Sequence, residues 1–426
     1  MSAHTMRWLA VPAAGRLRQL WYAPLLAAAM GLMMARMLIL ARLLPLQQFA
    51  QFSAGMLISS TFCMLGCFGL QSLLQREWPV NLIRRQEGRG LVLAAQCNLV
   101  AVGCAVAALL GAASGVMIAG IPPPLLALGV VHGLSQQMFL IATVESRSRG
   151  NAVRYSWQNL ARSVLTLGLG TAVAVATDSA QWVLAVESGI CFAISIKLFS
   201  GSATRGALSV YEIYALAVRR LPKVKWSAAL TLMAVATVSF MTMNADRWVA
   251  SAALDVEGFG TYSFAWIVLM IAQAAQALIN ASAYPMLARR YASHGRQGAF
   301  RLCVQSSGAI LVLGLLLVVP VWFGLEWAIR LWFPAYSRAL ALVPLFLVIG
   351  LLRVSDFWSS YLLITGRERR LLALNMGAAL IGVAAWATIA RPWSQPLQLM
   401  GVAYLAATLA FVSYVTAVGF AWQARV

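Results

Sequence analysis

Charged residues are scarce in this sequence, and acidic residues are the scarcest among them. Asp, Glu, Lys and Arg make up 10% of the 426 residues, whereas hydrophobic residues make up 61%. A chain of this composition cannot hide its apolar surface in one water-soluble core, so its solvent must be a lipid bilayer. The formal net charge of +20 then reflects membrane topology and anionic lipids, and no nucleic-acid partner is expected, because no basic patch is interleaved with stacking aromatic residues.

Other features are also missing, and each absence excludes a class of protein. No connector between apolar runs exceeds about 25 residues, so no extramembrane catalytic or binding domain is expected. No glycine-rich loop carries the Lys-Ser/Thr that binds nucleotide phosphates, so this chain is not expected to hydrolyse ATP. The 6 cysteines lie in or beside apolar runs without a nearby His or carboxylate, which predicts neither disulfides nor a metal site. We therefore expect a protein that is not an enzyme and has no cofactor.

What the sequence does contain is a series of long apolar runs. Runs of about 20 residues, enough to cross a bilayer as a helix, can be drawn about twelve times. They begin near Leu20, Ala50, Leu91, Pro123, Trp157, Trp182, Trp226, Phe259, Cys303, Ala339, Leu371 and Leu397. The sequence thus predicts an all-α polytopic membrane protein.

The Arg and Lys residues fall almost entirely into alternate connectors. These groups are Arg7, Arg16 and Arg18; Arg76, Arg84, Arg85 and Arg89; Arg147, Arg149 and Arg154; Arg205, Arg219, Arg220, Lys223 and Lys225; Arg289, Arg290, Arg296 and Arg301; and Arg367, Arg369 and Arg370. Cytoplasmic loops of membrane proteins carry such an excess of cations, so both termini are predicted to be cytoplasmic.

A faint repeat divides the chain into two halves. Phe49-Ala-Gln-Phe-Ser53, which opens the second run, recurs as Phe259-Gly-Thr-Tyr-Ser263, which opens the eighth. Because an even number of runs separates them, the halves are parallel repeats, related by an axis along the membrane normal. We predict a six-helix bundle in residues 1–200, a cytoplasmic linker with an interfacial helix in 201–225, and a second six-helix bundle in 226–426, around a central cavity.

Three stretches resemble one family of transporters: residues 38–53, residues 244–249 with 256–263, and residues 283–289. They are similar to the first-span exit, the seventh-span region and the eighth-span exit of bacterial polysaccharide flippases. These proteins, which handle O-antigen and exopolysaccharide precursors, belong to the multidrug, oligosaccharidyl-lipid and polysaccharide exporter superfamily. The resemblance implies a flippase in the bacterial inner membrane that moves an undecaprenyl-diphosphate-linked oligosaccharide to the periplasmic leaflet by alternating access. Its expected partners are this substrate, membrane lipids, and the glycan polymerase and export machinery.

Two other functions stay open at this point. A drug/cation antiporter of the same superfamily is expected to have an acidic cavity, whereas the apolar runs of this chain hold more cations than acids. A glycan polymerase or ligase is expected to carry a long periplasmic loop, and every connector on that side is short. Both alternatives are therefore less favoured than the flippase.

Charged residues inside the runs are the sharpest candidates for a site, because each costs about 2.5–3.5 kcal/mol to insert at mid-membrane. Arg36 and Arg353 are predicted to bind the substrate diphosphate through bidentate hydrogen bonds. For Arg36 the alternative is a structural ion pair with Glu187 or Asp246. For Arg353 it is a pair with Asp356, three residues later on the same helical face.

Uncharged and acidic residues complete the predicted site. Gln273, Gln276 and Asn280 form one polar stripe at helical spacing, suited either to sugar hydroxyls or to hydrogen bonds between helices. Three carboxylates are the candidates for carrying a coupling ion: Glu187, Asp356 and Asp246. The patch of His132, Ser135 and Gln136 and the patch of Gln158, Asn159 and Arg162 are attributed to packing.

Overall fold

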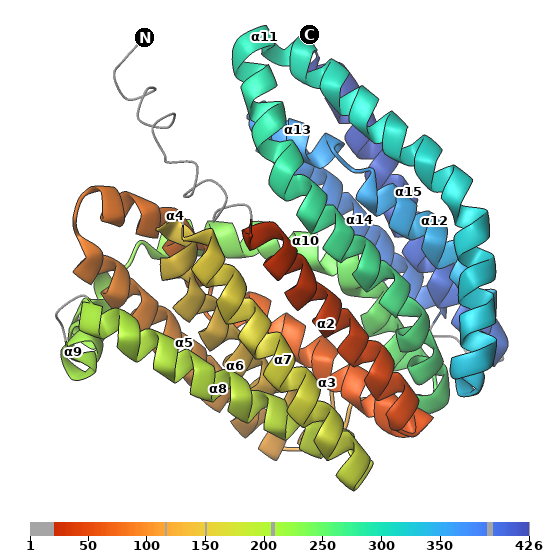
Figure 1. Cartoon of the computed structure of the whole chain (residues 1–426), viewed down its shortest axis with the longest axis horizontal. Coiled ribbons are helices and arrows are strands. Elements are labelled where there is room, and N and C mark those ends of the chain that lie inside the picture. Colours follow the sequence, from red (N-terminus) through yellow and green to blue (C-terminus); the bar gives the residue numbers. More distant parts are fainter. Residues whose placement is uncertain (1–20, 116, 150, 206–208, 390–394, 426) are drawn as a thin grey trace.

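The chain folds into two bundles of long α-helices that lie side by side (Figure 1). The computed structural model describes residues 21–115, 117–149, 151–205, 209–389 and 395–425. The predicted basic group Arg7, Arg16 and Arg18 lies outside these described residues.

In its described residues the N-terminal bundle contains seven helices, followed by a short amphipathic helix. Its helices are α2 (Tyr22–Leu43), α3 (Leu46–Leu65), α4 (Leu70–Ile83), α5 (Glu87–Ala113), α6 (Pro123–Ser148), α7 (Ala152–Thr177) and α8 (Ala180–Arg205), followed by α9 (Val210–Arg220) and the short 3-10 helix η1 (Leu221–Lys223). A capping box between Ser209 and Glu212 starts α9, and the buried side chains of Ile213 and Ala217 hold it against α5.

The C-terminal bundle contains the remaining helices. They are α10 (Trp226–Ala253), α11 (Val256–Trp332), η2 (Pro334–Ala341), α12 (Val343–Val354), α13 (Trp358–Ile364), α14 (Glu368–Ile389) and α15 (Gln395–Ala424). The 77 residues of α11 form two spans that meet at Gly295, whose φ of 64° and ψ of −165° break the helix. The connector predicted around Arg289 and Arg296 is therefore mostly helical, with its turn confined to this glycine.

The number of membrane spans agrees with the expectation. Among the described residues, 10 helical segments are long and apolar enough to cross a membrane, and the bent pair α3–α4 raises this to 11. The apolar part of α14, Leu372–Gly382, is the remaining candidate. The prediction of an all-α protein with about twelve spans in two repeated bundles is confirmed.

The second span is sharply bent where α3 meets α4. The two helices differ in direction by 54°, and Gly69 starts α4 with a φ of 76°. A Cβ atom at Gly69 would lie 2.0 Å from the carbonyl oxygen of Ala229 in α10. Glycine is required at this position for two reasons: the left-handed backbone conformation and the close approach of the two bundles.

The bundles meet closely at the end of the molecule that carries few cations. The ring of Phe49 in α3 packs edge-on against Tyr336 in η2, with centroids 5.7 Å apart. On α11, Gly260 lies against Leu46 and Ala50 of α3, so close that a Cβ atom at Gly260 would be 3.0 Å from the carbonyl oxygen of Leu46. The two repeated segments, which begin at Phe49 and Phe259, therefore face each other, as equivalent helices beside a two-fold axis should.

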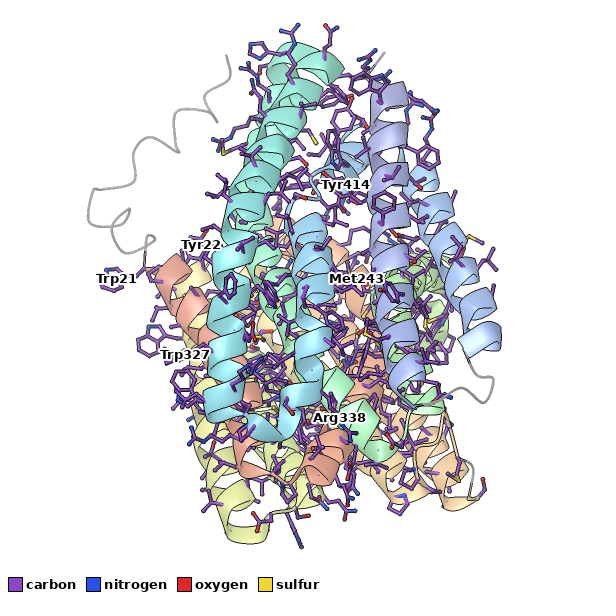
Figure 2. All side chains as sticks on the ribbon, turned by 90° about the vertical axis from the view of Figure 1, so that its right-hand side faces the viewer. Trp21, Tyr22, Met243, Trp327, Arg338 and Tyr414 are labelled. Atoms are coloured by element: carbon purple, nitrogen blue, oxygen red, sulfur yellow. The ribbon has the colours of Figure 1, made fainter. Side chains whose placement is uncertain are left out.

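Large apolar and aromatic side chains cover the outside of both bundles. Trp21 and Trp327 point away from the ribbon (Figure 2) and are 65% and 61% exposed, as expected of residues that contact lipid. Trp78 lies near the end of an apolar run, where tryptophans often contact the membrane surface. Its side chain is instead buried against Gly90. It belongs to the packing between α4 and α5.

Candidate functional site

A buried ion pair joins two helices of the N-terminal bundle. Nη1 of Arg36 in α2 donates to Oε2 of Glu187 in α8 at 2.8 Å, and the two side chains are 1% and 0% exposed. The structure thus contains the Arg36–Glu187 pair that the sequence left open as an alternative. In this conformation Arg36 is enclosed within its bundle and does not reach solvent.

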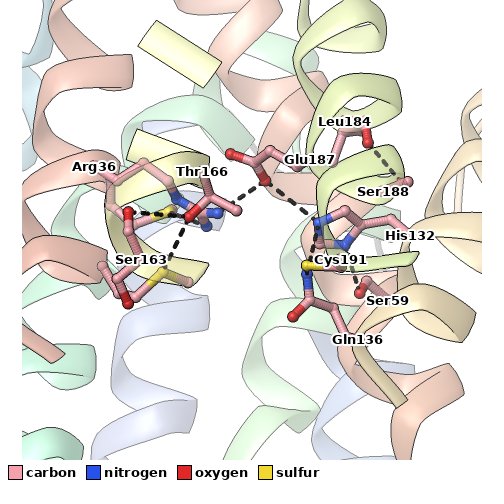
Figure 3. A network of polar contacts seen from close by, with 12 residues as sticks. Arg36, Ser59, His132, Gln136, Ser163, Thr166, Leu184, Glu187, Ser188 and Cys191 are labelled. Carbon is pink, nitrogen blue, oxygen red and sulfur yellow. Dashed lines mark hydrogen bonds and ion pairs between the residues drawn. The ribbon is translucent and has the colours of Figure 1, made fainter. Parts of the chain in front are cut away.

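The ion pair extends into a polar network that also includes side chains of α3, α6 and α7; most of it is visible in Figure 3. Nε2 of His132 in α6 lies 3.3 Å from Oε2 of Glu187, and Nδ1 of His132 lies 2.8 Å from the hydroxyl of Ser59 in α3. Gln136, one turn after His132, accepts a 2.9 Å hydrogen bond from Arg162 of α7. Nε2 of His132 also lies 3.3 Å from the side-chain amide nitrogen of Gln136, so the histidine contacts Glu187, Ser59 and Gln136.

One oxygen of Glu187 is left without a partner. Oε1 is buried and makes no hydrogen bond, and it faces Gly170 of α7, where a Cβ atom would lie 3.1 Å away. A buried carboxylate oxygen without a donor is costly, because it has lost its hydration without replacement. Glu187 therefore has one oxygen engaged in the ion pair and one without a hydrogen-bond partner.

The C-terminal bundle holds a polar cavity of about 200 Å³. Arg353 of α12 lines it, and Nη1 of Arg353 is buried without a hydrogen-bond partner. The other polar lining residues are Ser239, Thr242, Gln276, Asp356, Ser359, Ser360, Asn375, Ser413 and Tyr414. The cavity therefore offers one guanidinium, one carboxylate and several hydroxyl and amide groups.

Arg353 and Asp356 do not share a continuous helix. The tenth span is broken between Val354 and Trp358, and Asp356 lies in the break, where its carboxylate accepts hydrogen bonds from the backbone and hydroxyl of Ser359. Among the described residues no ion pair joins Arg353 to Asp356. The idea that i,i+3 spacing pairs these residues is wrong because the helix ends before the second one.

Asp246 lies where the bundles meet and has its own donors. Its Oδ2 accepts hydrogen bonds from the hydroxyl of Tyr262 at 2.6 Å and from the indole of Trp266 at 3.1 Å. Its neighbour Arg247 donates to the carbonyl oxygen of Ser53 in the other bundle at 3.2 Å and lies over the ring of Trp266. Asp246, predicted as a carrier of a coupling ion, is thus buried in a cluster with Arg247, Tyr262 and Trp266, and its role stays a prediction.

The predicted amide stripe is divided by the structure. Gln276 lines the C-terminal cavity, Gln273 is half-buried on α11, and the side chain of Asn280 lies outside the described residues. Sequence reasoning missed His132 as a partner of Glu187, Gln136 as a partner of Arg162, and Asn375 as a lining residue. A single polar residue in an apolar run signals such a role only when the depths of several helices are compared.

Comparison with known proteins identifies the fold. No known family model matches the sequence, and no curated protein is similar to it in sequence. Among solved structures, an outward-facing MATE-family multidrug resistance transporter of the MOP superfamily matches with a TM-score of 0.59 and 14% identity over 95% of this chain and 96% of its own. The inward-facing form of such a transporter gives 0.58 and 13% over 93% and 95%.

A eukaryotic MATE transporter matches with a TM-score of 0.53 and 9% identity over 96% of this chain and 100% of its own. The chain therefore has the MATE fold over nearly its full length. At this level of identity the likeness concerns the fold alone, so any function must be argued from the residues of this chain.

Proposed function

We propose that this protein is a transporter of the bacterial inner membrane that works by alternating access, with both termini in the cytoplasm. The support is the fold, which related structures adopt in inward-facing and outward-facing forms. In this chain the contacts of Phe49 with Tyr336 and of Gly260 with Leu46 close the cation-poor end. These contacts would have to separate for release on that side.

The substrate class that the geometry supports best is an undecaprenyl-diphosphate-linked oligosaccharide, which makes the protein a flippase. The observation that carries this proposal is the unpartnered Nη1 of Arg353 in a cavity lined by hydroxyl and amide groups. A guanidinium binds phosphate oxygens in a fixed geometry, and hydroxyl and amide groups suit sugars. The cavity, at about 200 Å³, is smaller than pockets that enclose a whole ligand, which measure roughly 300–1,000 Å³. It would therefore hold the diphosphate or one sugar, and the remainder of the substrate would lie between the bundles.

Glu187 is the carboxylate proposed to carry a coupling proton. Its Oε1 has no donor, while its Oε2 balances the charge of Arg36. A proton on Oε1 would remove that charge and weaken the tie between α2 and α8. Arg36 would then be free to turn toward substrate, which is how its predicted binding role fits with the ion pair. Asp356 and Asp246 remain secondary candidates because each already accepts two hydrogen bonds.

A second candidate function, a drug/cation antiporter, is favoured by the structural neighbours, which include multidrug resistance transporters. The two functions differ in the charge that the cavity must accept. An antiporter for cations would use Asp356 as the binding group, whereas the flippase would use Arg353.

Reconstitution into liposomes separates these candidates. We expect the protein to flip a fluorescent undecaprenyl-diphosphate oligosaccharide, measured by quenching from the outside, and not to drive uptake of a cationic dye under a proton or sodium gradient. Loss of a charge-assisted hydrogen bond costs about 1.5–3 kcal/mol, so Arg353→Ala should slow flipping about 10- to 100-fold, and Arg353→Lys should retain part of it.

The matched control is Arg338→Ala, which removes an exposed arginine of η2 (Figure 2). It should flip at the normal rate. Normal flipping by a well-folded Arg353→Ala protein would remove Arg353 from substrate binding. Gradient-driven dye uptake without flipping would replace the flippase by the antiporter.

A further inference from the structure

A second cavity, of about 640 Å³, lies at the end of the N-terminal bundle that carries the basic connectors. Helices α4 and α5 form one side of this cavity, and the linker after α9 forms the other. Figure 1 shows α9 at the edge of the N-terminal bundle beside these helices. Six cationic side chains line the cavity: Arg76, Arg84, Arg89, Arg220, Lys223 and Lys225.

The cations of this cavity are largely free of acidic partners. Glu77 is the one carboxylate in the lining, and it pairs with Lys225 at 2.8 Å. In the described part of the chain the five arginine and lysine side chains other than Lys225 make no ion pair. Arg149, also in a basic connector, contrasts with them because it is bound by Glu87 at 2.6 Å and by Glu145 at 2.7 Å.

Membrane topology alone does not account for this arrangement. The positive-inside rule requires cations in the connectors, but it does not require connectors that are distant in sequence to converge on one cavity. Here the connectors are held together by a specific contact. The buried side chain of Gln96, which lines the cavity, donates a 3.2 Å hydrogen bond to the carbonyl oxygen of Ala217 and so fixes α9 to α5. The cations are thus held around a fixed floor.

Exposed apolar side chains in this part of α4 favour a lipid over a soluble anion. Val80, which lines the cavity, is exposed, and Ile83 at the end of the same helix is 84% exposed. Apolar side chains beside a basic cavity at the membrane surface are suited to acyl chains below a bound headgroup, and basic pockets at this level are known to bind anionic lipid headgroups. A soluble phosphate compound would leave these side chains unused.

We propose that this cavity binds the headgroup of an anionic membrane lipid that carries two phosphates, one engaged by Arg84 and Arg89 and the other by Arg220 and Lys223. Such a lipid would contact both the N-terminal bundle and the linker that leads to the C-terminal bundle. It would therefore bias the position of one bundle relative to the other. The proposal rests on this cavity alone and stands whether or not the protein is a flippase.

The test measures lipid retention by purified protein with native mass spectrometry, using cardiolipin as the two-phosphate lipid, phosphatidylglycerol as the one-phosphate lipid and inorganic pyrophosphate as the soluble competitor. A cation near the membrane surface contributes about 1 kcal/mol. Removing two, in Arg84→Gln/Arg89→Gln, should weaken cardiolipin binding about 30-fold. The control is Arg289→Gln/Arg290→Gln, which removes two exposed cations from α11 and should leave binding unchanged.

A gain of binding guards against loss through misfolding. Glu77→Gln removes the single carboxylate of the lining and frees Lys225, so it should tighten cardiolipin binding. Equal retention by the Arg84/Arg89 and Arg289/Arg290 variants would overturn the site. Equal affinity for cardiolipin and phosphatidylglycerol would overturn the two-phosphate assignment, and pyrophosphate binding as tight as that of cardiolipin would overturn the lipid assignment.

Discussion

The Arg36–Glu187 pair provides the most direct test of how the N-terminal bundle is held together. Removing one partner of a buried ion pair leaves the other charge uncompensated, which costs about 3–5 kcal/mol. Both side chains are almost fully enclosed and their atoms are 2.8 Å apart, so water cannot replace the missing partner. We therefore expect Arg36→Ala and Glu187→Gln each to lower the free energy of unfolding by about this amount.

The double variant distinguishes a pair from two independent residues. If the costs were additive, Arg36→Ala/Glu187→Gln would lose about 6–10 kcal/mol, close to the whole stability of many proteins. Because the second change removes the stranded charge, we expect the double variant to be more stable than this additive estimate. The coupling energy between the two residues should be about 2 kcal/mol or more. Arg42→Ala, at an exposed position of the same helix, should change stability by less than about 0.5 kcal/mol.

The assay is reversible unfolding in mixed detergent micelles, combined with flipping by the same proteins in liposomes. Additive costs, with a coupling energy below about 0.5 kcal/mol, would refute the energetic importance of the pair. The flipping rate then separates scaffold from substrate contact. A folded double variant that flips more slowly than Glu187→Gln without a pH gradient supports a role for Arg36 in binding, and one that flips as fast as Glu187→Gln removes that role.

Three further predictions concern the backbone, the coupling ion and the topology. Gly69→Ala should abolish accumulation of folded protein, because the new Cβ atom would clash with the carbonyl oxygen of Ala229. Gly115→Ala, also at positive φ but with open space around it, should lower the free energy of unfolding by only about 1–2 kcal/mol. Equal stability of the two variants in an unfolding titration would contradict the clash. Glu187→Gln should abolish the stimulation of flipping by a pH gradient, whereas Asp356→Asn should retain it, and the opposite result would move the proton to the C-terminal bundle. Reporter fusions after Gly115 should score periplasmic and those after Glu87 cytoplasmic, and inversion of both would reverse the threading.

Hydrophobic runs were sufficient to predict an all-α protein of about twelve spans, because bilayer thickness acts on the sequence locally. The partners of the buried charges were harder to predict, because they depend on which helical faces meet. From the sequence, either Glu187 or Asp246 could have paired with Arg36. The packing of α2 against α7, which in turn packs against α8, selects Glu187. The alternative that Arg353 pairs with Asp356 was wrong, because it assumed a continuous helix, and the break after Val354 contains no glycine or proline that would have signalled it.

The repeated architecture makes the difference between the two bundles informative. The interval that separates Phe49 from Phe259 also separates Arg36 from Asp246, so equivalent helices carry a buried cation in one half and a buried anion in the other. Each charge is matched locally, Arg36 by Glu187 and Asp246 by the hydroxyl of Tyr262. An ion pair can be broken by one proton, whereas a hydrogen-bonded carboxylate keeps its donor, so equivalent positions have acquired different chemistry on the same scaffold. This difference is the physical reason for placing proton coupling in the N-terminal bundle and anion binding, through Arg353, in the C-terminal one.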